Sequence, residues 1–125
     1  MAKGLGASVT TIHVVDKSSF GMVDDLLSYY RGGNVVEYEI ALKKQAEEFL
    51  NEIKLVLEKA GIRASIEVVI SKSSAAEGII DFAKEADADL IIIGTKGLTG
   101  VERFLMGGVA ASVIRHAHCP VLAVR

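Results

Sequence analysis

The sequence predicts an α/β fold, a doubly wound parallel sheet with helices on both faces, and three observations support this class. Segments of β propensity alternate with segments of helical periodicity in the order β-α-β-α-β-α-β, which favours parallel strands joined by right-handed crossovers. The short run Leu90–Ile93 is apolar throughout, as is typical of a strand buried on both faces. Half of the 125 residues are hydrophobic. We therefore expect residues 1–125 to form a single domain with a substantial core.

The first part of the chain contains two predicted strands and one long predicted helix. Ser8–Val15 is rich in β-branched residues, which predicts a strand. Ser, Gly and Asp residues indicate a loop over Asp16–Asn34, in which Val23–Tyr30 could form a short helix. Apolar residues at three- and four-residue spacing, Phe49 and Leu50 among them, predict a helix over Val35–Ala60 that Gly61 caps. A second strand is predicted over Ala64–Ile70.

The remaining elements are shorter. Ser74, with Glu77 three residues later, has the pattern of a capping box and predicts a helix that runs to about Ala86. The buried strand at residues 90–93 comes next, and Gly108–Ala117 can form a short helix. Pro120–Arg125 predicts a last strand, since proline is tolerated at the first position of a strand.

Composition and charge exclude several classes of function. The formal net charge is -2 and no cluster of Lys and Arg stands out, which argues against a nucleic-acid partner. No apolar run approaches the roughly 18 residues that a membrane helix needs. The first residues lack the apolar stretch of a signal peptide, and the lone Cys119 cannot form an internal disulfide. We therefore expect a cytoplasmic protein without a membrane partner.

The most informative segment follows the predicted strand at residues 90–93. Gly94, Lys96 and Gly97 stand close together, and Gly107 and Gly108 follow after nine further residues, where a helix begins. Ligands of parallel sheets bind beyond the carboxyl ends of the strands, and a helix N-terminus offers free N–H groups to an anion. Glycines let the backbone approach a ligand closely, and a lysine adds positive charge. The spacing lacks the Gly-Lys-Ser/Thr ending of a P-loop, and glycines alone could merely turn a strand into a loop.

The stretch from Asp89 to Arg125 resembles the C-terminal signature of universal stress proteins. The nucleotide motif of that family is Gly-x-x-Gly, nine residues, then Gly followed by Ser or Thr, and Gly94, Gly97 and Gly107 match it in register. The resemblance also includes residues 6–16, the long helix and residues 76–94, and so covers nearly the whole chain. It implies a Rossmann-like fold of the adenine nucleotide alpha hydrolase type, frequent homodimers and, in one branch, bound ATP or AMP.

Carried over by position, the resemblance implies a set of residues that hold the phosphates and ribose: Gly94, Lys96, Gly97, Gly107, Gly108 and Val109. Val14 would lie near the adenine. Gly108 stands where the ATP-binding branch has a hydroxyl residue, so one hydrogen bond to a phosphate is lost, which costs about 1.5–3 kcal/mol. We expect binding of ATP or a related adenine nucleotide, with or without Mg²⁺, to be weakened rather than necessarily abolished.

The start of the chain departs from the family pattern. Universal stress proteins normally begin with a strand that carries an Asp near its end and then a helix, whereas Met1–Leu5 resembles only the tail of that helix. The strand that is lacking would lie in the middle of the sheet beside Ser8–Val15, where unpaired backbone is costly. A misplaced start, a rearranged sheet or a segment exchanged between chains would each account for this. We favour a start that is shortened relative to the family.

The last predicted strand suggests an interface. Val121–Val124 is apolar on both faces and is expected at an edge of the sheet, where exposed apolar strands are prone to pair with other chains. We expect a homodimer through this strand, while an edge covered by the chain's own loops is the alternative.

The residues outside the loop give weaker signals. His116, His118 and Cys119 cluster within four residues, but their spacing matches no standard zinc pattern, so we expect a helix end and the entry to a strand rather than a metal site. Asp16 could approach a bound Mg²⁺, although the start of a turn is its simpler explanation.

Three functions follow from these observations. The first is a nucleotide-binding module that acts in stress response or signalling. The second is a homodimeric interaction protein of the same family that binds no nucleotide, which Gly108 and the absent Asp-bearing strand favour. The third is a slow ATP hydrolase. The sequence presents no clear base for a water molecule and no paired metal carboxylates, so we assign no catalytic residue and expect at most weak hydrolysis.

Overall fold

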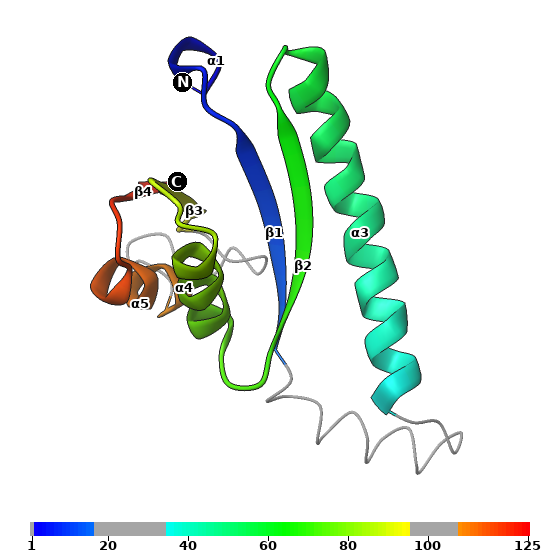
Figure 1. Ribbon diagram of the computed structural model, residues 1–125. Helices are drawn as coiled ribbons and strands as arrows, with labels where there is room; N and C mark the ends of the chain where they lie inside the picture. The colour runs from blue at the N-terminus through cyan, green and yellow to red at the C-terminus, as the bar shows by residue number, and fades with distance from the viewer. Residues whose placement is uncertain (1, 17–34, 96–107) are drawn as a thin grey trace. The chain divides into compact units, whose positions relative to one another are not determined.

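The computed structural model describes residues 2–16, 35–95 and 108–125. The chain divides into two compact units, Met1–Lys72 and Ser73–Arg125, and each unit contains one pair of parallel strands (Figure 1). The predicted α/β class, with parallel strands and helices, is therefore confirmed.

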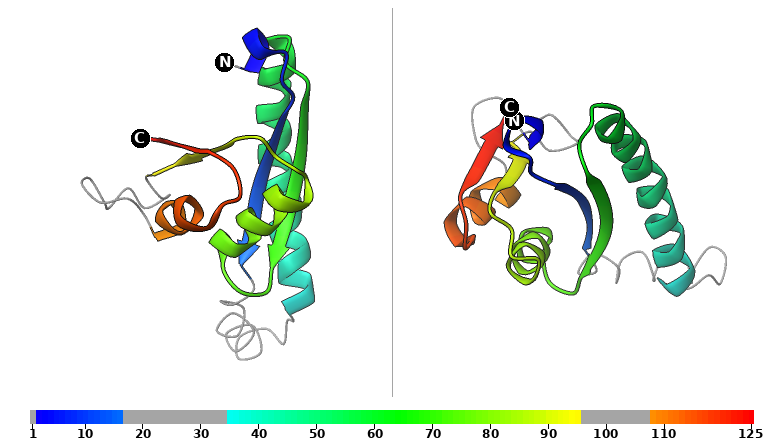
Figure 2. Two further views of the ribbon diagram at one scale, coloured as in Figure 1. Left: turned by 60° about the vertical axis from the view of Figure 1, so that its left-hand side comes forward. Right: turned by 45° about the horizontal axis from the view of Figure 1, so that its top comes forward.

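The first unit contains α1 (Ala2–Leu5), β1 (Val9–Asp16), α3 (Val35–Lys59) and β2 (Ala64–Ser71). The two strands pair in parallel along their whole length, from Val9 opposite Ala64 to Asp16 opposite Ser71. Helix α3 lies along the strand pair and contacts both strands (Figures 1 and 2). The predicted strands and the long helix agree with these bounds to within one residue at each end.

Helix α3 is held by a narrow apolar face and by a glycine at its end. Leu50 is 1% exposed and Ala46 is 9% exposed, so the residues four apart on this face are buried. Phe49, which the spacing placed on the same face, is instead 61% exposed, because its position in the helical turn lies at the margin of the face. The helix closes with a Schellman motif, in which Gly61 has a φ of 81° and its N–H donates to the carbonyl of Glu58 at 3.0 Å.

The second unit contains α4 (Ala75–Glu85), β3 (Ile91–Gly94), α5 (Gly108–His116) and β4 (Val121–Val124). Strands β3 and β4 pair in parallel. The core of this unit joins α4, β3 and α5 through four buried residues: Ala76, Ala83, Ile91 and Val113.

Both ends of α4 are fixed by local hydrogen bonds. The backbone N–H of Glu77 donates to Oγ of Ser74 at 3.2 Å, as the capping pattern predicts. The Glu77 carboxylate accepts from Oγ of Ser73 at 2.5 Å. At the other end Asp87 has a φ of 53°, a conformation in which glycine is more usual, and Ala88 donates to the carbonyl of Ala83 at 2.9 Å.

The described strands form two parallel pairs, β1–β2 and β3–β4, and each pair has free edges within the described part of the chain. Strand β3 also differs from the expectation of burial on both faces. Ile91 is 9% exposed and belongs to the core, but the next residue, Ile92, is 58% exposed. Successive side chains of a strand point to opposite faces, so the described part of the chain covers the Ile91 face of β3 and leaves the Ile92 face exposed.

Candidate functional site

The structure describes the two ends of the glycine-rich segment that the sequence singles out. Gly94 is the last residue of β3, and Gly108 is the first residue of α5. Three of the predicted site residues, Lys96, Gly97 and Gly107, lie outside the described residues. The described part of the candidate site therefore consists of a strand end and a helix start.

The end of β3 is anchored to β4. The backbone N–H of Thr95 donates to the carbonyl of Val124 at 2.8 Å, and the hydroxyl of Thr95 donates to the same oxygen at 3.3 Å. The N–H of Ile91 donates to Pro120 at 3.0 Å. Alternate residues of a strand direct their backbone groups to the same neighbour, so the N–H and C=O of Gly94 face the opposite, free edge of β3.

The surroundings of Gly94 leave room for a side chain. A Cβ built on Gly94 would meet only the carbonyl oxygen of Val124, at 4.0 Å, which is an ordinary van der Waals distance. The φ of Gly94 is not in the left-handed region. Neither backbone conformation nor crowding by the described residues therefore requires glycine at this position.

The start of α5 is exposed, whereas its next turn is fixed in the core. Ala110 is 2% exposed and Val113 is 0% exposed, so the helix is held firmly. Gly108 is exposed, and a Cβ built on it would meet no atom of the described residues within 4 Å. The first turn holds no acidic residue. Its free N–H groups and the positive end of the helix dipole can thus attract an anion. Val109 is 42% exposed beside them.

Val14 belongs to the first unit. It lies near the carboxyl end of β1, is half-buried and stands opposite Val69 of β2. The N–H of Val9 donates to the carbonyl of Arg63 at 2.9 Å. Because alternate residues of a strand face the same neighbour, the odd-numbered residues of β1 face β2, as Val9 does. The backbone groups of Val14 therefore face away from β2, toward the free edge of β1.

The cluster near the end of α5 has a structural setting. His116 ends the helix and is exposed, as is His118, while Cys119 is half-buried and packs against the core of the second unit. Within the described ranges no group of three or more His, Cys, Asp and Glu residues could hold a metal ion. None of the described helices is long and apolar enough to cross a membrane.

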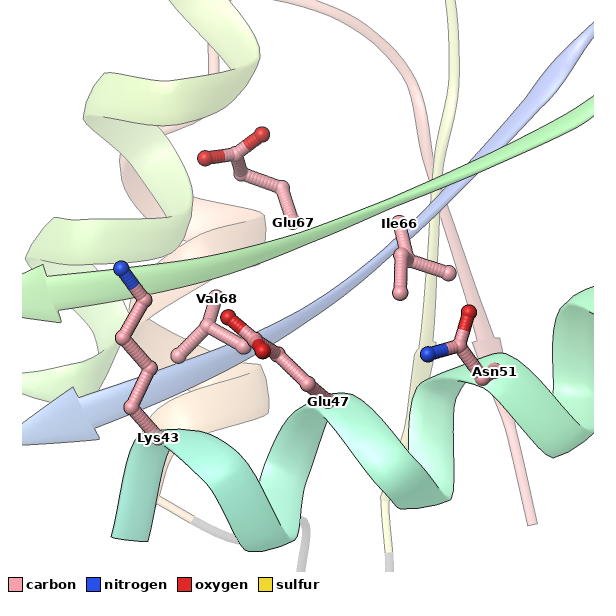
Figure 3. Close-up of a pocket in the computed structure, with 6 residues that line it drawn as sticks. All are labelled: Lys43, Glu47, Asn51, Ile66, Glu67 and Val68. Carbon is pink, nitrogen blue, oxygen red and sulfur yellow. The ribbon is translucent and has the colours of Figure 1, made fainter. Parts of the chain in front are cut away.

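A second feature, which sequence reasoning missed, is a shallow cavity of about 200 Å³ in the first unit (Figure 3). It lies between α3 and β2 and is lined by six residues: Lys43, Glu47, Asn51, Ile66, Glu67 and Val68. Figure 3 shows Ile66 and Val68 on the side of β2 that faces α3, and Glu67 on the other side. The signal in the sequence was the polar row at four-residue spacing on α3, which is ordinary for a solvated helix face.

The structure is that of an α/β protein with parallel strands. The exposed start of α5, which follows β3 in the chain, can attract an anion. The sequence model of the universal stress protein family matches residues 1–125. The chain therefore belongs to the universal stress protein family, as the resemblance of its C-terminal third implied.

Known members of the family show the extent of the similarity. A universal stress protein of Methanocaldococcus jannaschii is 38% identical over 125 residues, which are 100% of this chain and 69% of that protein. The structure of UspA from Lactobacillus plantarum matches the structure of this chain with a TM-score of 0.78 and 24% sequence identity, over 99% of this chain and 81% of that one. A universal stress protein from Archaeoglobus fulgidus, solved in complex with dAMP, has a TM-score of 0.66 at 23% identity, over 99% of this chain and 78% of that one. The two structures support the shared Rossmann-like fold.

Proposed function

We propose that this protein is an adenine-nucleotide-binding module that acts in stress response or signalling. The observation that carries the proposal is the space that the described residues leave open at Gly94 and Gly108, which a ligand could use and which packing by those residues does not explain. The relative from Archaeoglobus fulgidus, whose structure contains dAMP, supports an adenine nucleotide as the ligand.

The residues of the proposed site would contact different parts of the nucleotide. Backbone N–H groups of Gly108 and Val109 at the start of α5 would bind phosphate oxygens, since they lie at the positive end of the helix dipole. Gly94 would let the backbone approach the ligand at the end of β3. Lys96, Gly97 and Gly107 complete the proposed phosphate and ribose contacts, and Val14 would contact the adenine. Mg²⁺ would accompany the phosphates of ATP, as it commonly does in nucleotide sites.

The test is isothermal titration of the purified protein with ATP and with AMP, each with and without Mg²⁺. In a Gly94→Ala variant the added methyl group fits the protein at an ordinary contact distance. If the ligand approaches Gly94, this variant should bind nucleotide at least tenfold more weakly than the wild-type protein. If the ligand does not approach Gly94, the affinity should be unchanged. Gly4→Ala is the matched control, because Gly4 lies in α1 and a Cβ there also meets none of the described residues within 4 Å. Equal affinities for the two variants would refute this site.

A second candidate function is homodimeric interaction without nucleotide, and the free edge of β4 favours it. Pro120 accepts a hydrogen bond from Ile91 of β3, and Val124 accepts one from Thr95, the residue after β3. The alternate residues Val121 and Ala123 therefore direct their backbone groups to the other edge. Leu122 is 44% exposed and Val124 is 46% exposed. We propose that Val121–Val124 pairs with its copy in a second chain.

The dimer has its own test. Ala123→Pro removes an N–H that faces the free edge and leaves the donors to the β3–β4 ladder in place, so it should convert a dimer into a monomer in light scattering. Ala123→Ser keeps the N–H and should remain dimeric. A dimer that survives the proline substitution would show that the interface lies elsewhere.

We also propose that residues 1–125 fold as one domain and that the protein is cytoplasmic. A single domain should unfold in one cooperative transition with coincident probes, and two separated transitions would contradict it. Fractionation of cells that express the native protein tests its location.

A further inference from the structure

We propose that the free edge of β2, together with the polar row of α3 beside it, binds an extended peptide that adds as an antiparallel strand, with an acidic side chain opposite Lys43 and a basic one opposite Glu47. This site lies wholly within the first unit and does not depend on nucleotide binding.

The backbone of β2 supplies the hydrogen-bonding edge. Within the described part of the chain β2 pairs with β1 alone. Since Arg63 accepts from Val9 of β1, the odd-numbered residues of β2 face β1 by alternation. The N–H and C=O groups of Ala64, Ile66 and Val68 therefore face the free edge. Such an edge is a template for strand addition.

The cavity places side-chain recognition beside this edge. Ile66 and Val68 of β2 and the row Lys43, Glu47 and Asn51 of α3 line the same hollow (Figure 3). All three residues of that row are exposed. A strand added to β2 would direct every second side chain toward α3 and into this hollow.

The charged side chains of Lys43 and Glu47 are available to a partner. Among the described residues, no partner forms a hydrogen bond or an ion pair with the side chain of Lys43 or of Glu47. Their order, with Lys four residues before Glu, is the less favourable one for a pair within a helix. An incoming peptide could thus pair with each charge without breaking a hydrogen bond or ion pair between these side chains and the described residues.

The spacing of the charges matches a strand. Residues four apart on a helix lie about 6 Å apart along its axis. Alternate residues of a strand lie about 7 Å apart. One peptide side chain can therefore face Lys43 while the next on the same face meets Glu47. Lys43 lies toward the arrowhead of β2, at its C-terminal end, and Glu47 lies further back (Figure 3). An antiparallel strand meets Lys43 first, so its sequence is acidic-x-basic.

The experiment compares two nine-residue peptides of alternating Val and Thr, one with Glu-x-Lys and the other with Lys-x-Glu at its centre, on the full chain without nucleotide. Two exposed ion pairs should give the Glu-x-Lys peptide a preference of about two- to tenfold in fluorescence anisotropy at low salt. A charge-exchanged protein, Lys43→Glu with Glu47→Lys, should prefer the Lys-x-Glu peptide by a similar factor. Both positions are exposed, so the exchange should leave the fold unchanged, which circular dichroism checks.

A second measurement separates strand addition from simple charge attraction. Methylation of the peptide backbone nitrogens should abolish binding at the alternate positions whose N–H groups face β2 and should have little effect at the positions between them. Equal binding of the two peptides, a preference that does not reverse in the charge-exchanged protein, or insensitivity to methylation would each overturn the proposal.

Discussion

Replacing Gly108 by serine tests the proposed nucleotide site by adding the one group that it lacks. A Cβ at Gly108 meets none of the described residues within 4 Å, and the φ of Gly108 is outside the left-handed region, so serine should fit without strain. Serine is also a better helix former than glycine. The new hydroxyl can donate a hydrogen bond to a phosphate, worth about 1.5–3 kcal/mol for a charged acceptor. Because about 1.4 kcal/mol corresponds to a tenfold change, ATP should bind about 10- to 100-fold more tightly.

Calorimetric titration of the wild-type and Gly108→Ser proteins with ATP measures this gain directly. Adenosine is the matched ligand control, because it lacks the phosphates and its affinity should not change. Gly4→Ser is the matched protein control, since this glycine is also unobstructed and lies in the first unit. An unchanged affinity for ATP in Gly108→Ser, or an equal gain for adenosine, would refute the placement of the phosphates at the start of α5.

Four further substitutions test the fold that supports the site, each by denaturant unfolding. Ser74→Ala removes the acceptor of the Glu77 N–H and should lower the free energy of unfolding by about 1 kcal/mol; no change would mean that the cap is satisfied by water. Asp87→Gly relieves a left-handed φ of 53° and should raise the stability by about 0.5–1 kcal/mol, whereas a loss would indicate that the aspartate side chain stabilises the turn. Leu50→Ala, at 1% exposure, should cost about 2–5 kcal/mol, while Phe49→Ala, at 61% exposure, should cost less than about 1 kcal/mol. Equal losses at these two positions would contradict the orientation of α3.

Local patterns predicted the elements of the fold well, because each depends on residues that are close in sequence. The Ser74–Glu77 pattern gave the start of α4, and Gly61 gave the end of α3, since capping hydrogen bonds span only three to five residues. The end of α4 lacked such a signal, because Asp87 takes the left-handed position that glycine usually occupies.

Features that depend on distant residues were harder to predict. The apolar run at residues 90–93 indicated burial on both faces, but Ile92 is 58% exposed because burial depends on what packs against each face of the strand. Likewise, Phe49 fits the helical spacing of the core face, yet a shift of a fraction of a turn leaves it in solvent. Periodicity gives the direction of a face and does not give its width.

The candidate site was predicted from the sequence only in part. The strand end at Gly94 and the helix start at Gly108 are where the spacing placed them. The cavity between α3 and β2 was missed, because its polar residues resemble any solvated helix face until the neighbouring strand edge is seen.

The most direct test of nucleotide binding is mass spectrometry of the small molecules released on denaturing protein that was purified without added nucleotide. The proposed function predicts ATP, ADP or AMP at close to one per chain, and its loss in the Gly94→Ala variant but not in Gly4→Ala. The absence of nucleotide from the wild-type protein, together with no heat of binding for ATP and Mg²⁺, would contradict the nucleotide site and leave the dimeric interaction protein as the better account.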